Sequence, residues 1–266
     1  MSWYELIRNG VKLRGFDGGQ GPSIIFQHGL GGDDAQVAET FPMSGFHRLT
    51  LECRAHGLSQ AGNPHNFTIT KFTDDVLAFA DSRSFKRFAV GGISMGAAIA
   101  MRMAVITPER VSALILARPA WMWEPAPSNM YVFKLLSEYL ASDDKTGFEV
   151  SRIAKEFAEL APDNHASLLR FFDRGDQAVT AKLLAAIAED GPRITKAEIN
   201  AIQVPTLVIG NAIDLVHPLS HAIALAQNIP NAIFVEIAPK ALDKRQHLVE
   251  LQNAVTAFLQ HQGLFE

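Results

Sequence analysis

The sequence has very little cysteine and no excess of positive charge, and both shortages exclude classes of protein. Its one cysteine, Cys53, excludes an internal disulfide and a zinc site built from several thiolates. The formal net charge is -4, with 24 basic and 28 acidic residues. A chain of this charge does not predict the basic face that nucleic-acid backbones require. We therefore expect no nucleic-acid partner and a reducing compartment.

Long hydrophobic runs are also missing. The apolar stretch from Gly96 to Ile106 is much shorter than the roughly 20 residues that span a bilayer, and Arg102 interrupts it. The N-terminal segment lacks the basic region and apolar run of a secretory signal. These features predict no membrane partner and a cytoplasmic location.

Hydrophobic patterning predicts a chain in which strands and helices alternate. Asn9-Gly10 separates two strand-like runs and is a strong hairpin signal, because both turn positions need a positive φ. The expected strands are Trp3–Arg8, Val11–Phe16, Ser23–Gln27, Arg48–Cys53, Arg87–Gly91, Val111–Ala117, Val204–Gly210 and Ala232–Ile237. The expected helices of the same region are Asp34–Thr40, Thr70–Asp81, Ala97–Thr107, Leu219–Ala226 and His247–Gln260. This alternation predicts an α/β fold with a mostly parallel eight-stranded sheet and helices on both faces.

Between residues 121 and 202 the alternation stops. This stretch holds only helical patterns, at Met130–Leu140, Phe148–Leu160, Ala166–Phe172 and Val179–Asp190. It is too long for a loop, so we interpret 121–202 as an inserted helical cap. The two segments on either side, 1–120 and 203–266, form the predicted α/β core.

A candidate nucleophile lies between a predicted strand and the helix that follows it. Gly92-Ile93-Ser94-Met95-Gly96 matches the pattern G-x-S-x-G. A serine on such a tight turn projects its hydroxyl above the sheet, and the turn tolerates only small neighbours. The strand and helix around it make a chance match a poor explanation, and we predict that Ser94 is the nucleophile.

Attack by a serine requires donors that stabilise the resulting oxyanion. The backbone N–H of Met95, directly after the nucleophile, is the first candidate. The second is expected in the glycine-rich segment after the third strand, His28–Gly32, where Leu30 is the preferred donor. The alternative is a glycine-rich connection with no chemical role.

A catalytic acid and a histidine base should follow the serine in that order. Asp214 lies just after the apolar strand Val204–Gly210, where ligands meet parallel sheets. Its alternative role is to cap the following helix. His247 opens the last helix and fits the base best, while His217 lies near enough to Asp214 to compete.

In its motifs and in the order of its predicted elements, the chain resembles the α/β-hydrolase superfamily, in particular its capped branch of esterases, lactonases and carbon–carbon bond hydrolases. The segment Arg54–Ser59 is similar to a loop of that branch. By this resemblance Ser94, Asp214 and His247 would form a catalytic triad, with Leu30 and Met95 as the oxyanion hole. The chain departs from the usual pattern in that Gln246, and not a glycine, precedes His247. A serine nucleophile argues against haloalkane dehalogenases and epoxide hydrolases, which use an aspartate.

The resulting hypothesis is a serine hydrolase that cleaves an ester or lactone of a small-to-medium substrate through an acyl-enzyme. It needs no metal and no organic cofactor. Trp121 and Trp123 lie where a strand leads into the cap and are candidate substrate-binding residues, although they could equally pack between cap and core. Arg118 could meet a substrate carboxylate or form an internal ion pair.

Two other functions remain open on the sequence. The same triad could cleave a carbon–carbon bond or act as a lyase. A protein that keeps the fold only to bind a ligand, without turnover, is the alternative from another class. The sequence leaves the oligomeric state open, a homodimer included.

Overall fold

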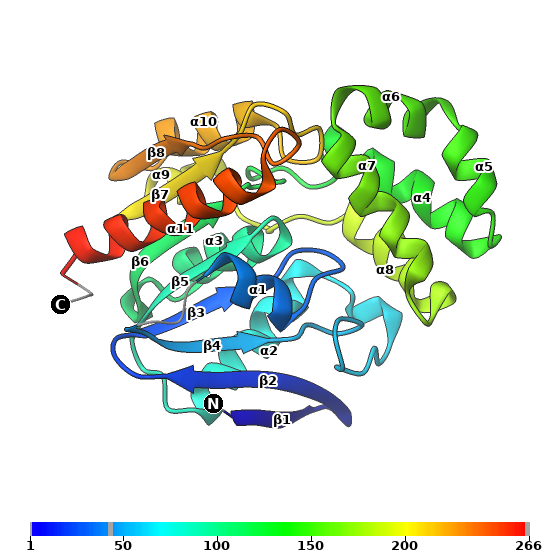
Figure 1. Cartoon of the computed structure of the whole chain (residues 1–266). Coiled ribbons are helices and arrows are strands. Elements are labelled where there is room, and N and C mark those ends of the chain that lie inside the picture. The colour runs from blue at the N-terminus through cyan, green and yellow to red at the C-terminus, as the bar shows by residue number, and fades with distance from the viewer. Residues whose placement is uncertain (1, 42–44, 264–266) are drawn as a thin grey trace.

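An eight-stranded sheet forms the centre of the molecule. The computed structural model describes residues 2–41 and 45–263. The strands run in the order β1-β2-β4-β3-β5-β6-β7-β8, and every pairing from β4 to β8 is parallel (Figure 1). Their bounds are β1 Ser2–Arg8, β2 Val11–Gly19, β3 Ser23–Gln27, β4 His47–Leu51, β5 Phe88–Ile93, β6 Val111–Ala117, β7 Thr206–Gly210 and β8 Ala232–Glu236. The predicted eight-stranded, mostly parallel sheet is confirmed.

The hairpin at the N-terminus forms one edge of this sheet. Asn9 and Gly10 have φ values of 51° and 76°, the positive values that a tight two-residue turn requires. β1 and β2 pair antiparallel from Arg8 and Val11 outward. β2 continues to Gly19, three residues beyond the predicted end at Phe16, because its last residues pair with β4.

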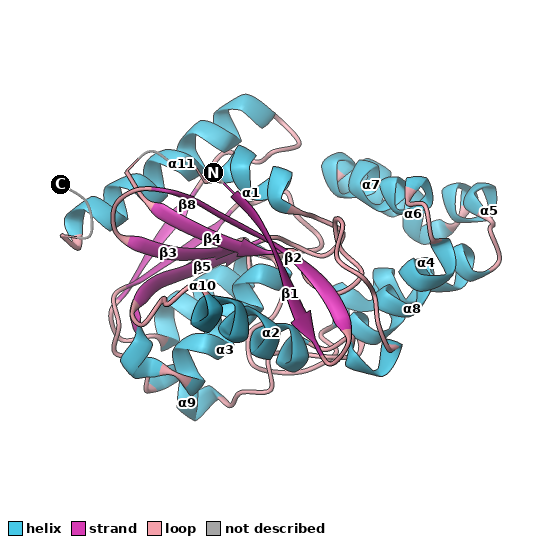
Figure 2. Ribbon diagram, turned by 90° about the horizontal axis from the view of Figure 1, so that it is seen from below, coloured by secondary structure: helices cyan, strands magenta, loops and turns pink. Residues whose placement is uncertain are grey.

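Helices cover both faces of the sheet (Figure 2). α1 (Asp34–Thr40) and α11 (Lys244–His261) lie on one face. α2 (Ile69–Ser82), α3 (Met95–Ile106) and α10 (Leu219–Asn228) lie on the other. Within the part of the chain that the structure describes, none of the helices combines the length and apolar character needed to cross a membrane. Each face buries its own cluster of apolar side chains against the strands.

The segment between β6 and β7 is helical, as the sequence predicts. Five of its helices lie together beyond one end of the sheet and are called the cap below (Figure 1). They are α4 Tyr131–Ala141, α5 Lys145–Val150, α6 Arg152–Leu160, α7 Pro162–Leu169 and α8 Gln177–Ala188. The single helix expected at Phe148–Leu160 is two helices, α5 and α6. Ser151 separates them, because its side chain caps α6 by accepting a hydrogen bond from the Ala154 N–H.

One short helix in this region was not predicted. α9 (Lys196–Asn200) has five residues, too few for a helical spacing to emerge. Its signal is a capping box, in which Thr195 and Glu198 bond to each other's backbone N–H. α9 packs against α10 of the core.

Candidate active site

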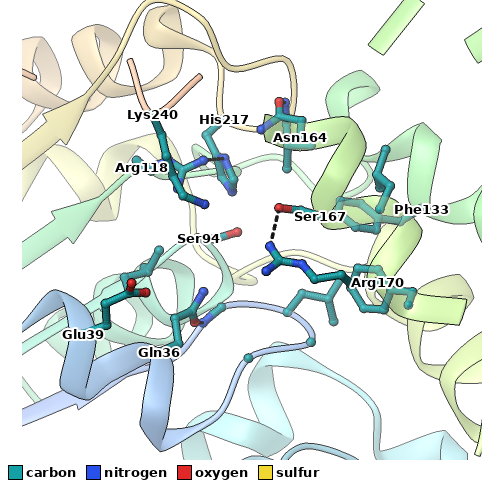
Figure 3. A pocket seen from close by; sticks show the side chains of 18 of the residues that line it. Gln36, Glu39, Ser94, Arg118, Phe133, Asn164, Ser167, Arg170, His217 and Lys240 are labelled. Atoms are coloured by element: carbon teal, nitrogen blue, oxygen red, sulfur yellow. Dashed lines mark hydrogen bonds between the residues drawn. The ribbon is translucent and has the colours of Figure 1, made fainter. Parts of the chain in front are cut away.

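Three neighbouring parallel strands end at one place, and each is followed by a polar side chain. Ser94 follows β5, Arg118 follows β6, and Asp214 lies four residues after the end of β7. Because β5, β6 and β7 are adjacent in the sheet, these ends lie side by side. Figure 3 shows Ser94, Arg118 and His217 around one cavity beneath the cap.

Ser94 occupies a strained turn between β5 and α3. Its φ and ψ are 55° and -112°, a combination that L-residues adopt rarely. Its N–H donates a hydrogen bond to the Ala117 carbonyl at 3.0 Å, which fixes the turn to the neighbouring strand β6. The side chain lies in the cavity although the residue is only 8% exposed. This is the geometry that the G-x-S-x-G pattern predicts.

The two glycines of the motif are required by close backbone approaches. A Cβ on Gly92 would lie 2.4 Å from the Gly96 carbonyl carbon, and a Cβ on Gly96 would lie 2.3 Å from the Gln27 carbonyl oxygen. Both distances are too short for real contacts. Any side chain at either position would therefore push the nucleophile turn away from its neighbours.

Two backbone N–H groups are available beside Ser94. Met95 is the first residue of α3, so its N–H has no partner inside the helix. Within residues 2–41 and 45–263, neither the Met95 N–H nor the Leu30 N–H is hydrogen-bonded to another residue. Leu30 lines the cavity with Ser94. The two N–H groups predicted as oxyanion donors thus have no hydrogen-bond partner in the described residues, and Leu30 lines the cavity.

The glycine-rich loop that carries Leu30 is held from behind by His28 and Gln36. The His28 Nε2 accepts a hydrogen bond from the Cys53 N–H at 3.0 Å, so its Nδ1 carries the proton that is donated to the Gly29 carbonyl. Gln36 Oε1 accepts from the Gly29 N–H at 2.7 Å. Burial lowers the pKa of His28 to about 4, which keeps the ring neutral. His28 is therefore a support of the loop and not a base.

Asp214 is buried and its carboxylate is fully occupied. Arg118 donates to Oδ2 from Nε at 2.8 Å and from Nη2 at 2.6 Å. His217 donates to Oδ1 through its backbone N–H at 3.0 Å, and its Nδ1 lies 2.8 Å from the same oxygen. Burial by itself would raise the pKa of Asp214, but Arg118 and His217 outweigh it and hold the pKa well below its usual range. The direction of this shift favours the ionised form of Asp214.

This anion fixes the tautomer of His217. A carboxylate only accepts hydrogen bonds, so the Nδ1 at 2.8 Å must carry the ring proton. The Nε2 is then unprotonated and able to accept a proton. Burial lowers the pKa of His217 and outweighs the opposite effect of Asp214. His217 is consequently a neutral ring on the cavity that contains Ser94.

His247, the base expected from the sequence, makes no hydrogen bond to Asp214 within residues 2–41 and 45–263. Its Nδ1 donates to the Ala238 carbonyl at 2.8 Å, and the residue is 2% exposed. It is the fourth residue of α11, after the N-cap Asp243. His247 is absent from the described residues that line the cavity, whereas His217 is present. The histidine that contacts Asp214 is therefore His217, three residues further along the chain.

Cap residues hold the loop that carries Asp214 and His217. Asn164 of α7 is buried, and its Oδ1 accepts from the Leu215 N–H at 2.8 Å and the Val216 N–H at 3.1 Å. Lys240, after β8, forms an ion pair of 2.9 Å with Asp163 of the same helix. A shift of α7 would therefore move the acid and histidine as well.

The cavity beside Ser94 has a volume of about 340 Å³. Phe133 and Phe171 of the cap form an apolar wall, with their rings edge to face at 5.9 Å. Trp121 and Trp123, the predicted substrate contacts, are not among the described lining residues. Trp121 is fully buried and its Nε1 donates to the Asp190 carbonyl at 2.9 Å. The packing interpretation fits Trp121, and the aromatic wall of the cavity comes from elsewhere in the cap.

The described residues offer no arrangement suited to a metal ion. No group of three or more His, Cys, Asp or Glu side chains in 2–41 and 45–263 is close enough to hold one. The polar groups that do converge are a hydroxyl, a neutral imidazole with its carboxylate, and free N–H groups. This set suits nucleophilic acyl transfer.

Comparison with known proteins identifies the family of the fold. A family model described as alpha/beta hydrolase fold matches residues 22–241. A protein of Pseudomonas syringae pv. syringae named "Putative carbamate hydrolase RutD" is 26% identical over 91% of this chain and 95% of its own length. A pimeloyl-[acyl-carrier protein] methyl ester esterase of Nitrosomonas europaea is 26% identical over 82% of this chain and 87% of its own. The enol-lactonase from Burkholderia xenovorans has the same fold, with a TM-score of 0.75 at 23% identity, and the match covers 97% of this chain and all of that one. With its strand order and a family match over most of its length, the chain belongs to the alpha/beta hydrolase fold family.

Proposed function

We propose that the protein is a serine hydrolase that cleaves an ester or lactone, with Ser94 as nucleophile, His217 as base and Asp214 as the acid that orients it. The observation that carries the proposal is the position of His217, whose Nδ1 lies 2.8 Å from an Asp214 oxygen and which lines the same cavity as Ser94. His217 takes the role that the sequence assigns to His247.

The proposed reaction has two balanced halves. In the first, the Ser94 Oγ attacks the carbonyl carbon while its proton passes to Nε2 of His217. The N–H groups of Leu30 and Met95 bind the resulting oxyanion. The bond to the leaving alkoxide then breaks, and His217 returns the proton to it. In the second half, a water gives one proton to His217 as its oxygen attacks the acyl carbon. The bond from that carbon to the Ser94 Oγ then breaks, His217 returns the proton to Ser94, and the acid is released.

The relatives support an acyl substrate of this kind. One relative is named as a methyl ester esterase, and a structural neighbour is an enol-lactonase. The relative named as a carbamate hydrolase would attack a carbonyl carbon as well. A carbamate should therefore be assayed as a substrate beside esters and lactones, because its cleavage would use the same nucleophile.

The first prediction concerns covalent labelling of the nucleophile. A fluorophosphonate probe should label the wild-type protein on Ser94, and Ser94→Ala should abolish the label, because the activated hydroxyl attacks phosphorus as it would a carbonyl. Mass spectrometry of the labelled peptide checks the site. Ser167→Ala is the matched control, since Ser167 is another hydroxyl of the cavity, and it should keep the label. A wild-type protein that takes up no probe would contradict the proposal.

The second prediction concerns pH. A base must be neutral to accept a proton, and burial lowers the pKa of His217 below its usual 6.5. The value of kcat/KM for a neutral ester should therefore be flat at pH 7 and above, and should fall as the pH drops through a midpoint below 6.5. A pH profile between about 4.5 and 9 measures this midpoint. A midpoint above 6.5 would point to a base in a different environment.

A further inference from the structure

The cavity beside Ser94 is lined by far more positive than negative charge. Of the described residues that line it, Glu39 is the one carboxylate, and five side chains are cationic. The cations are Arg118, Arg170, Arg174, Lys240 and Lys244. An acyl-transfer reaction on a neutral ester requires none of them. A cation without a partner in this cavity is therefore a candidate to bind a charged group of the substrate.

Three of the five cations are matched by carboxylates. The ion pairs are Arg118–Asp214 at 2.6 Å, Lys240–Asp163 at 2.9 Å and Lys244–Glu39 at 2.8 Å. Each of them joins two different elements around the cavity, and each has a structural explanation. They leave Arg170 and Arg174, which make no ion pair with a carboxylate in residues 2–41 and 45–263.

Arg174 is occupied by the backbone. Its Nη1 donates to the Gly31 carbonyl at 2.9 Å and its Nη2 to the Ala55 carbonyl at 2.7 Å. These bonds tie the cap to the glycine-rich loop that carries Leu30. Arg174 is thus a positioning residue of that loop, and these two bonds hold its guanidinium against the backbone.

Arg170 is the remaining cation. It follows α7 directly, and Figure 3 shows its guanidinium reaching from the cap into the cavity, toward Ser94. Its one hydrogen bond in the described part of the chain runs from Nη2 to the Ser167 hydroxyl at 3.0 Å. That bond orients the group without neutralising it. A guanidinium has five N–H donors in a planar fork that matches the two oxygens of a carboxylate.

We propose that Arg170 binds a carboxylate of the substrate, so that the natural ester or lactone is an anion with an apolar middle part. The inference rests on the proposed function for the position of the scissile bond at Ser94. The apolar part would lie along Phe133 and Phe171, between the carboxylate on Arg170 and the carbonyl at Ser94. The excess positive charge of the cavity would also attract such a substrate from solution.

A pair of esters that differ in charge tests this inference. Mono-p-nitrophenyl glutarate carries a carboxylate at the far end, and its methyl ester does not. In the wild type, kcat/KM should favour the charged ester by about tenfold or more, mostly through KM, since the carboxylate is bound before and during the reaction. Arg170→Gln should bring the ratio between the two esters close to one. Arg152→Gln, which removes an exposed cap arginine outside the cavity, should keep the ratio.

Binding to a protein that cannot turn over separates this inference from the proposed function. With Ser94→Ala, titration calorimetry should give a Kd about tenfold lower for the charged ester than for the neutral one, and Arg170→Gln added to that variant should remove the difference. If neither ester is hydrolysed by the wild type but this difference is found, the proposed function fails and the carboxylate site stands. If both esters are hydrolysed equally and bind equally, the hydrolase stands and the inference is overturned.

Discussion

Replacing His217 with alanine is expected to lower kcat about a thousandfold or more, while replacing His247 lowers it no more than a few-fold. A general base in the proper position contributes about 10² to 10⁴ to the rate. His217 holds its Nδ1 proton on Asp214 and presents Nε2 to the cavity, whereas the Nδ1 of His247 is bonded to the Ala238 carbonyl. Steady-state kinetics on a p-nitrophenyl ester, with both variants beside the wild type, measures the contrast.

Stability must be measured in parallel, because His247 is a buried residue. Its removal leaves the Ala238 carbonyl without its donor, which costs about 1–3 kcal/mol of the free energy of unfolding. Circular dichroism will show whether each variant is folded at the assay temperature. Added imidazole should restore part of the activity of His217→Ala, since it can enter the vacated space as a base. A large loss confined to His247→Ala would instead support the base expected from the sequence.

The turn that carries the proposed nucleophile could be predicted from the sequence because its requirements are local. Ser94 needs a strand before it, a helix after it and small residues around it, and all of these lie within one short segment. The same holds for Met95, whose N–H is free because it begins α3. The position of Asp214 could be predicted for a similar reason, because the end of an apolar strand fixes its place at the edge of the sheet. These are properties of single elements, not of how elements pack.

The histidine that contacts Asp214 could not be predicted from such local features. His217 and His247 both follow Asp214 in the chain, so the order serine, acid, histidine admits either. The distinction depends on which loop folds back on the carboxylate. Asn164 of the cap holds Leu215 and Val216 of the loop before His217, a contact between segments about fifty residues apart. The available signal was the spacing of three residues between Asp214 and His217, which lets a backbone N–H and a side chain reach one carboxylate.

The residues of the cavity wall could not be predicted from the sequence, because only tertiary packing brings them together. Trp121 and Trp123 lie at the entrance to the cap in the sequence, but the Trp121 indole N–H is directed to the Asp190 carbonyl. Phe133, Phe171 and Arg170 lie deep within the cap sequence, and the folded chain places them around the same cavity as Ser94. The role of Arg118 could be predicted in part. The sequence allowed an internal ion pair or a substrate contact, and its pair is with the catalytic acid candidate.

Replacing Asp214 with asparagine is expected to lower kcat by about 10³- to 10⁴-fold. An amide at this position no longer compels the Nδ1 of His217 to carry the proton, and it does not stabilise the imidazolium that forms during attack. The same change leaves Arg118 without its carboxylate, which is expected to cost about 3–5 kcal/mol of stability for a largely buried pair. A low rate in this variant could thus arise from chemistry or from local disorder. Thermal unfolding and kcat must be measured together.

A double variant separates these two causes. Arg118→Met combined with Asp214→Asn removes the unpaired charge and keeps a long side chain against the loop, so most of the lost stability should return. The rate should remain low, because no anion orients His217. Arg118→Met alone should keep a measurable rate, since Asp214 and His217 still face each other. If the double variant regained the rate of the wild type, Asp214 would serve only as the partner of Arg118, and the proposed triad would lose its acid. If it regained stability alone, the carboxylate would have a catalytic role that is distinct from its ion pair.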